Sequence, residues 1–325
     1  MIVTSDFRLD SQGEISPYLL YVNIMQRVAN PIMIMLGVAG NTLSFLIMNQ
    51  PSNRNNVMCF HLKVLSVTDT FALVFYLLPK LIINIKPDVL ESRTVGEVNC
   101  QLFTAVLYLY NISIWQILII ALDRFIVVVF PLKAALSCTM RKAKIHVAMN
   151  VIAHVVIYFP NSFWSAQQDD DGLYSKCVFP KYFRWYGVGF EVINACVDVF
   201  LPLGLLFILN VAIIFSLKKQ SSEVKEKALG GVKTRQKQER TMTVMLIVVA
   251  TSLMIFLLPY TVDFIAWYCC LENIMVSEPN LRIFTFELAF IWAVANNASN
   301  FFLYLASSSK FRSDLKRLLL CNGGG

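Results

Sequence analysis

Two oppositely charged residues, Asp123 and Arg124, stand side by side near the end of a long apolar run. The run begins at Cys100 and is closed by Pro131. Twenty-four residues separate Cys100 from Arg124, and a helix of that length rises about 36 Å, enough to cross a bilayer. Charges in membrane-spanning segments are costly, so this pair is a functional candidate by default. The run predicts one helix with a cysteine at one membrane face and an acid–base pair at the other.

Thiol oxidation is a second candidate chemistry. Cys100 and Cys177 are both expected on the outer side, where disulfides persist. A bond between them would hold the loop between the fourth and fifth helices over the mouth of a bundle, and two free thiols are the alternative. The other cysteines lie on the inner side, within the fifth helix or at the end of the sixth: Cys59, Cys138, Cys321, Cys196, Cys269 and Cys270.

Asp69 is a lone carboxylate midway along the second apolar stretch, with no basic residue within a turn. Such a group must face the protein interior and find polar partners there. A carboxylate ringed by hydroxyl and amide oxygens suits Na⁺, and a water-filled hydrogen-bond network is the equally weighted alternative. The candidate partners come from the first, third and seventh stretches: Asn41, Ser113, Asn296, Asn297 and Asn300.

The elements that must position these residues are long apolar segments. The chain has 325 residues, of which 57% are hydrophobic and 15% charged, and this is not the composition of a soluble domain. The segments lack both a polar face and the alternation of a barrel strand, so helices are the spanning structure. The fold class is an all-α membrane protein, a seven-transmembrane helix bundle, with stretches at about 31–50, 60–85, 101–130, 145–164, 186–217, 242–268 and 283–306.

Orientation follows from the basic residues. With the N-terminus outside, 19 of the 28 lysines and arginines fall on the cytoplasmic side. The net charge of +7 is then a topology signal rather than a sign of nucleic-acid binding. We expect an extracellular tail at 1–27, the seven-helix bundle at 28–308, and at 309–325 a short amphipathic eighth helix that meets membrane lipids, followed by a cytoplasmic tail. Cys321 beside it is a palmitoylation candidate, or else an unmodified thiol.

Several motifs occur in order along the whole chain, and together they resemble a rhodopsin-like (class A) G-protein-coupled receptor. The general look is similar to invertebrate neuropeptide receptors of the FMRFamide-receptor-like kind. The residues that carry the resemblance are Gly40, Asn41, Leu65, Asp69, Cys100, Ser113, Asp123, Arg124, Phe125, Pro131, Cys177, Pro202, Pro259, Tyr260, Asn300 and Tyr304.

The resemblance implies a switch. Arg124 would be restrained at rest by Asp123 and by Glu239, which stands where the family has its acid at the inner end of helix six. Breaking the Arg124–Glu239 contact would let helix six swing out and admit a G-protein helix. Tyr304, which shares a helix-seven motif with Asn300, would then help hold the open state. The plainer reading is that the charges only mark the membrane edge. The chain departs from the family pattern at Leu257, Phe301, Asn210 and the helix-four position near Asn150 or Val151.

The ligand is predicted from the outer half. Val106 stands where amine receptors carry an aspartate, and helix seven has no lysine for retinal. Acids and aromatics there suit a short cationic peptide, for example an amidated Arg-Phe type. The alternative is an interfacial aromatic belt with solvated rim charges. The candidate ligand-binding residues are Val106, Glu191, Asp198, Asp263, Phe264 and Glu287.

The sequence therefore predicts a plasma-membrane receptor for an extracellular neuropeptide that activates heterotrimeric G proteins. No enzyme chemistry is indicated, because His61, His146 and His154 join no metal or nucleophile constellation. No cofactor is expected apart from Na⁺ at Asp69. A chemosensory or lipid receptor of the same fold is one alternative. A transporter or channel is the alternative from another class, and the absence of repeated halves speaks against it.

Overall fold

A computed structural model describes residues 17–169, 172–178, 195–226, 233–266 and 279–321. Among these residues, seven helices are long and apolar enough to cross a membrane, as the sequence predicted. They are α1 (Pro17–Met48), α2 (Val57–Ile85), α3 (Arg93–Val129), α5 (Met140–Tyr158), α7 (Leu201–Glu226), α8 (Lys233–Ile265) and α10 (Pro279–Ser307).

Shorter elements connect the long helices. The inner connections include η1 (Pro51–Asn53) and α4 (Pro131–Ser137), and the outer ones include η2 (Pro87–Glu91), η3 (Phe159–Phe163) and the strands β1 (Ser165–Gln167) and β2 (Lys176–Val178). The strands form an antiparallel hairpin in which Ala166 is opposite Cys177. A π-helix, η5 (Ala195–Phe200), leads into α7, and α11 (Ser309–Cys321) follows α10.

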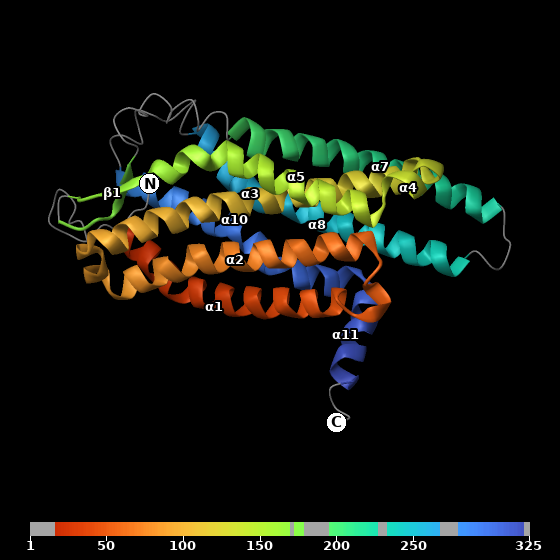
Figure 1. The fold of residues 1–325 in the computed structure, drawn as a ribbon, viewed down its shortest axis with the longest axis horizontal. Coiled ribbons are helices and arrows are strands. Elements are labelled where there is room, and N and C mark those ends of the chain that lie inside the picture. The colour runs from red at the N-terminus through yellow and green to blue at the C-terminus, as the bar shows by residue number, and fades with distance from the viewer. Residues whose placement is uncertain (1–16, 170–171, 179–194, 227–232, 267–278, 322–325) are drawn as a thin grey trace.

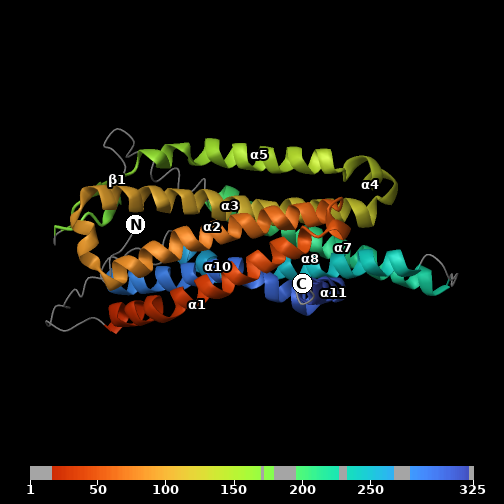
Figure 2. The ribbon, with the colours of Figure 1, turned by 60° about the horizontal axis from the view of Figure 1, so that its bottom comes forward.

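The long helices run side by side along the long axis of the molecule (Figures 1 and 2). α3 is the central helix, because it contacts α2, α5, α7 and α8. In its most apolar stretch, 61% of the residues are buried. α1 packs against α2 and α10 on one side of the bundle. The hairpin lies at one end, and α11 projects from the bundle toward the other end (Figure 1).

The first helix starts earlier than the sequence predicted. α1 begins at Pro17, whereas the boundary of the extracellular tail was expected at residue 27. Polar residues in this added part bind the outer end of α2: the Arg27 Nε donates to the Asn84 side-chain oxygen at 2.6 Å, and Asn84 donates to Gln26 at 3.2 Å. Contacts between helices therefore keep a polar stretch helical, which apolar periodicity cannot reveal.

Local signals explain several helix ends. The Asn56 side chain accepts hydrogen bonds from the backbone N–H groups of Met58 and Cys59 and so caps the start of α2. Thr139 accepts from the Lys142 N–H and caps α5 in the same way. Pro131 opens α4, where its missing N–H and fixed φ suit the first turn.

A close approach between α1 and α10 depends on a small residue. A Cβ atom at Gly40 would lie 2.9 Å from the Cβ atom of Phe301, closer than real side chains approach. Gly40 therefore lets α1 pack against α10 at the position of Phe301, one of the departures from the family pattern.

The amphipathic eighth helix is confirmed as α11. Phe311 is buried, and Leu315 and Leu318 pack against the hydrophobic core, whereas Leu319 is 61% exposed. Asp314 fixes the helix to η1, the turn that follows α1, because its side chain accepts from Asn53 at 3.1 Å. The side chain of Cys321 lies outside the described residues.

Candidate functional site

The middle of the bundle holds a polar core around Asp69. This carboxylate is fully buried and accepts three hydrogen bonds. Ser113 of α3 donates at 2.5 Å, and the amides of Asn297 and Asn300 of α10 donate at 2.9 and 2.7 Å. Asn41 of α1 joins indirectly, through its hydrogen bond to the Asn297 carbonyl at 3.1 Å. One acid thus ties together α2, α3 and α10.

The same core has acceptor oxygens to spare. The side-chain oxygens of Asn296, Asn297 and Asn300 are buried and have no hydrogen-bond partner among the described residues. Buried oxygens without donors are the groups that bind hard cations or ordered water. The oxygen atoms of this cluster therefore fit as ligands of a monovalent cation, which the Asp69 carboxylate and the amide oxygens would hold.

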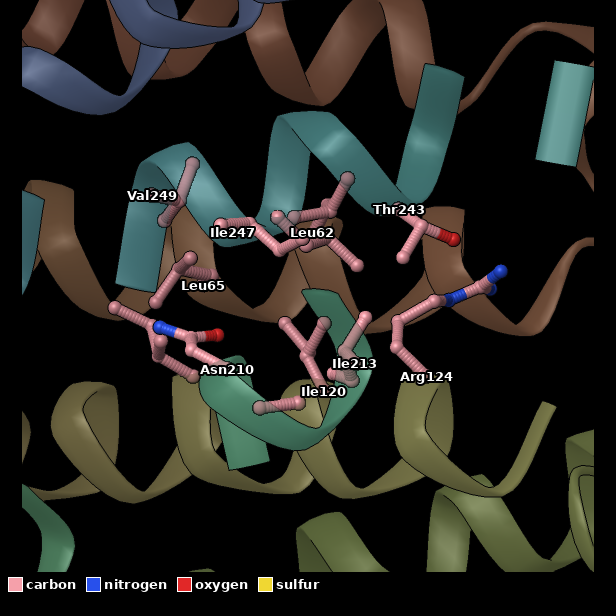
Figure 3. Close-up of a pocket in the computed structure, with 12 residues that line it drawn as sticks. Leu62, Leu65, Ile120, Arg124, Asn210, Ile213, Thr243, Ile247 and Val249 are labelled. Carbon is pink, nitrogen blue, oxygen red and sulfur yellow. The ribbon is translucent and has the colours of Figure 1, made fainter. Parts of the chain in front are cut away.

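Arg124 lines a pocket in the inner half of the bundle (Figure 3). Its walls come from four helices, namely α2, α3, α7 and α8. Arg124 and Thr243 lie toward one end of the pocket, and Leu65 and Asn210 toward the other (Figure 3). Asn210, which replaces the tyrosine of the family pattern, thus lines the same pocket as Arg124.

The partner of Asp123 is a residue that the motifs did not indicate. His61 of α2 places its Nε2 3.3 Å from the Asp123 carboxylate, and both side chains are buried. Gln116 of α3 donates from its amide to the Nδ1 of His61 at 2.6 Å. Glu239, the other predicted partner in the switch, has a side chain that lies outside the described residues.

Cys138, between α4 and α5, is the other neighbour of Asp123. Its Sγ lies 3.7 Å from the Asp123 carbonyl oxygen and 4.0 Å from the carboxylate. Partial burial and, secondly, the negative charge of Asp123 raise the pKa of the Cys138 thiol above its ordinary value. At neutral pH this thiol is therefore protonated and donates to Asp123.

The inner part of α10 packs tightly against α11. Tyr304 is buried and its ring meets Phe311 edge-on at 5.5 Å between centroids, and Phe301 meets the same ring at 5.7 Å. The Tyr304 hydroxyl is buried without a hydrogen-bond partner in the described part of the chain. Leu257 of α8, where the family has a tryptophan, is fully buried in the hydrophobic core of the bundle.

At the outer end, the predicted disulfide is present. Cys100 of α3 and Cys177 of β2 are bonded, and their Cα atoms lie 5.6 Å apart. The bond fixes the hairpin to the outer end of α3. Glu97 supports the same attachment, since its carboxylate accepts from the Ala166 N–H at 3.1 Å.

The outer acids that were ligand candidates already have partners within the chain. Asp263 of α8 binds Arg282 of α10 at 2.5 Å. Glu287 of α10 binds Lys80 of α2 and also accepts from the Gln26 amide at 3.3 Å. Both carboxylates therefore tie α10 to a neighbouring helix, and a cationic ligand would have to compete with an internal cation.

Of the other ligand candidates, one is buried, one is half-buried, and two have side chains outside the described residues. Val106 is buried in an apolar cluster with Tyr76 and Phe290, and Phe264 is half-buried on α8. Glu191 and the side chain of Asp198 lie outside the described residues.

Sequence reasoning did not identify the cations that pair with the outer acids, Lys80 and Arg282, or the histidine beside Asp123, His61. A signal existed for Lys80, since a lysine within an apolar helix needs an acidic partner. Arg282 stands five residues before Glu287, at the outer start of α10, and looks like a rim charge. His61 lies eight residues before Asp69, two turns away on the same face of α2, and that spacing was the only signal.

Comparison with known proteins agrees with this architecture. The family described as "7 transmembrane receptor (rhodopsin family)" matches residues 40–304. The FMRFamide peptide receptor frpr-18 of Caenorhabditis elegans is 24% identical, over 89% of this chain and 67% of its own. The FMRFamide receptor of Drosophila melanogaster is 23% identical over 85% of this chain. The somatostatin receptor type 1 of Rattus norvegicus is 23% identical over 88% of this chain.

The chain spans about half of the Drosophila receptor, 50%, and 69% of the somatostatin receptor. The family match covers far more than half of the chain, from Gly40 in α1 to Tyr304 in α10, and so includes both the polar core and Arg124. Together with the seven helices and the disulfide, this match shows that the chain belongs to the rhodopsin family of seven-transmembrane receptors.

Proposed function

We propose that the protein is a receptor for a short cationic peptide and that it activates heterotrimeric G proteins through its inner pocket. The observation that carries this proposal is that one helix, α8, extends from the outer acids to the inner pocket. α8 bears Asp263 at its outer end and Thr243 in the wall of the Arg124 pocket. A ligand that moves the outer end of α8 would therefore change the walls around Arg124.

The inner half supports coupling to a G protein. Arg124 is a cation at one end of a pocket with mainly apolar walls, and the inner connections are rich in lysine and arginine. In this proposal the inner end of α8 moves outward when the ligand binds, the pocket widens, and a segment of the G protein enters beside Arg124.

The outer half supports a cationic ligand. Asp263 and Glu287 are the acids there, and each holds an internal cation that a ligand guanidinium or ammonium could replace. Two relatives are named as FMRFamide receptors and a third as a somatostatin receptor, and both names refer to peptides. Exchange of one cation for another keeps each carboxylate paired, and the displaced Lys80 or Arg282 is partly exposed to solvent.

A screen of amidated and free peptides in cells that express a promiscuous G protein tests the proposal. Once an agonist is found, Asp263→Asn should lower its potency at least about tenfold, because a charge-assisted contact is lost. Asp88→Asn removes an exposed outer acid on η2 and serves as the matched control, with potency unchanged.

Three outcomes would contradict the proposal. Agonism by uncharged lipids or odorants alone would favour a chemosensory or lipid receptor of the same fold. Solute or ion flux without a G-protein response would favour a transporter or channel. Equal potency for wild type and Asp263→Asn would remove the cationic contact at this position.

We also propose Na⁺ as a ligand of the polar core, held by Asp69 with amide oxygens of Asn296, Asn297 or Asn300. Thermal unfolding in matched NaCl and choline chloride tests this proposal. Na⁺ should raise the midpoint of the wild type and leave that of Asp69→Asn unchanged. Equal midpoints for the wild type in both salts would leave the water-filled network as the correct description.

A further inference from the structure

The inner end of α2 carries a buried histidine that contacts the acid of the switch. His61 is 1% exposed, and its Nε2 lies 3.3 Å from the Asp123 Oδ2. The two atoms are close enough for a polar contact, but their alignment is not that of a directed hydrogen bond. A buried carboxylate needs a compensating polar group, and His61 is the one that another transmembrane helix supplies to Asp123.

Gln116 decides which ring nitrogen of His61 faces the acid. Its amide Nε2 lies 2.6 Å from the Nδ1 of His61, and an amide nitrogen can only donate. The Nδ1 atom therefore accepts, and the ring proton is on Nε2, which faces Asp123. Gln116 and Asp123 are seven residues apart on α3, so both lie on the face of that helix that meets α2.

Adjacent residues of a helix point about 100° apart, and this separates the roles of Asp123 and Arg124. The carboxylate of Asp123 is placed between His61 of α2 and the thiol of Cys138. The side chain of Arg124 lines the pocket that α7 and α8 complete (Figure 3). The acid and the arginine thus contact different groups on different sides of α3.

We infer that His61 is a positioning residue of the switch: it holds the Asp123 carboxylate against α2 and so leaves Arg124 less restrained at rest. The inference rests on the proposed G-protein coupling. Without His61, the carboxylate would turn to the neighbouring guanidinium, and the resting state would be stabilised. The receptor would then show lower basal and agonist-stimulated activity.

Nucleotide exchange on a heterotrimeric G protein, measured with purified full-length receptor in nanodiscs, tests this role. His61→Phe keeps a ring of similar size and removes the ring nitrogens. We expect it to lower basal exchange per folded receptor by roughly fivefold or more. His61→Gln keeps an N–H donor and should restore exchange to within about twofold of the wild type.

The double variant of His61→Phe and Asp123→Asn tests whether His61 acts through Asp123. Because His61 acts through Asp123, His61→Phe should add nothing to Asp123→Asn, and the double variant should match Asp123→Asn alone within about twofold. His154→Phe is the matched control. His154 is also buried, but its Nδ1 bonds to the Asn150 carbonyl oxygen on α5, and exchange should be unchanged.

The inference is overturned if His61→Phe exchanges like the wild type, or if the effects of His61→Phe and Asp123→Asn multiply. It is also overturned if His61→Gln is as impaired as His61→Phe, because that would indicate packing alone. If His61→Phe does not fold, Gln116→Met frees the same ring and should lower exchange at least about twofold, with an unchanged rate contradicting the inference. If the wild type promotes no exchange with any G protein, the proposed function itself fails and the inference fails with it.

Discussion

Asp69 shows how much one buried residue can organise. It is the single acceptor for three donors that come from two other helices. Replacing it removes the acceptor and leaves those donors buried without partners, and each such group costs about 1–3 kcal/mol.

We therefore expect Asp69→Ala to lower the free energy of unfolding by about 2–4 kcal/mol, seen as a lower thermal midpoint in detergent. Asp69→Asn keeps one acceptor and should cost less. Thr70→Ala is the neighbouring control, because the Thr70 hydroxyl bonds only to the Ser66 carbonyl of its own helix. An Asp69→Ala midpoint equal to that of the control would contradict the central place given to this carboxylate.

Cys138 provides a pH-dependent test of the surroundings of Asp123. The thiolate is the reactive form, and burial with the Asp123 charge raises the pKa of the thiol. The thiolate fraction at pH 7 is therefore lower than for an ordinary cysteine, and alkylation should be slow at pH 7 and rise with pH through pH 9 without levelling. Mass spectrometry of the Cys138 peptide measures the rate.

Asp123→Asn is the companion variant in that experiment. Removing the negative charge lowers the pKa of Cys138, so alkylation at pH 7 should become faster. A rate in the wild type that levels off below about pH 8.5 would show that the pKa is not raised.

At the scale of helices, ion pairs join α10 to two of its neighbours, α2 and α8. Glu287 binds Lys80 of α2, and Asp263 of α8 binds Arg282. Removing one partner of a buried pair leaves an uncompensated charge and costs about 3–5 kcal/mol, whereas replacing both can be neutral.

Lys80→Met should therefore lower the free energy of unfolding by about 3–5 kcal/mol, and Lys80→Met combined with Glu287→Leu should recover most of the loss. Arg93→Ala is the control, because Arg93 pairs with Glu97 at the surface and its side chain is 70% exposed. That change should cost about 0.5 kcal/mol or less. A double variant as unstable as Lys80→Met would refute the charge argument.

The sequence predicted the helices well because their signal is local. Apolar length alone located the seven spans, and the amphipathic pattern located α11. The start of α1 at Pro17 was missed because Asn23, Gln26 and Arg27 are polar, and the hydrogen-bond partners that keep them helical lie on α2 and α10. A contact across helices has no trace in the periodicity of either one.

The candidate sites also divide into features with a local sequence signal and features that depend on contacts between helices. Motif spacing located Asp69, Arg124 and the Cys100–Cys177 bond, since each belongs to a family pattern. It could not show that Glu287 and Asp263 are already neutralised, or that Asp123 faces His61. Those facts depend on which helix faces are adjacent, and only the packed bundle decides that.

Across the whole molecule, charged and polar groups lie at three levels. Ion pairs lie at the outer end, the Asp69 core lies in the middle, and Arg124 lies at the inner pocket. As a member of the rhodopsin family with seven apolar helices, the chain is a multi-pass protein of the plasma membrane and not an enzyme.

The Cys100–Cys177 bond closes a loop with a sequence separation of 77 and fixes the hairpin over the outer end. Cys100→Ser and Cys177→Ser should lower the free energy of unfolding equally, by about 2–4 kcal/mol, and the double variant should lose no more. Cys196→Ser, at an exposed free cysteine, is the control. Additive losses in the double variant would mean that the two thiols act independently.

Agonist-stimulated nucleotide exchange on a purified heterotrimeric G protein is the most direct test of the central claim. The wild-type receptor in nanodiscs should accelerate exchange when a cationic peptide agonist is added. Arg124→Ala should abolish most of the acceleration, while Arg317→Ala on α11 should retain it. Exchange that no peptide stimulates, or that Arg124→Ala leaves intact, would contradict the account of this chain as a peptide receptor that signals through Arg124.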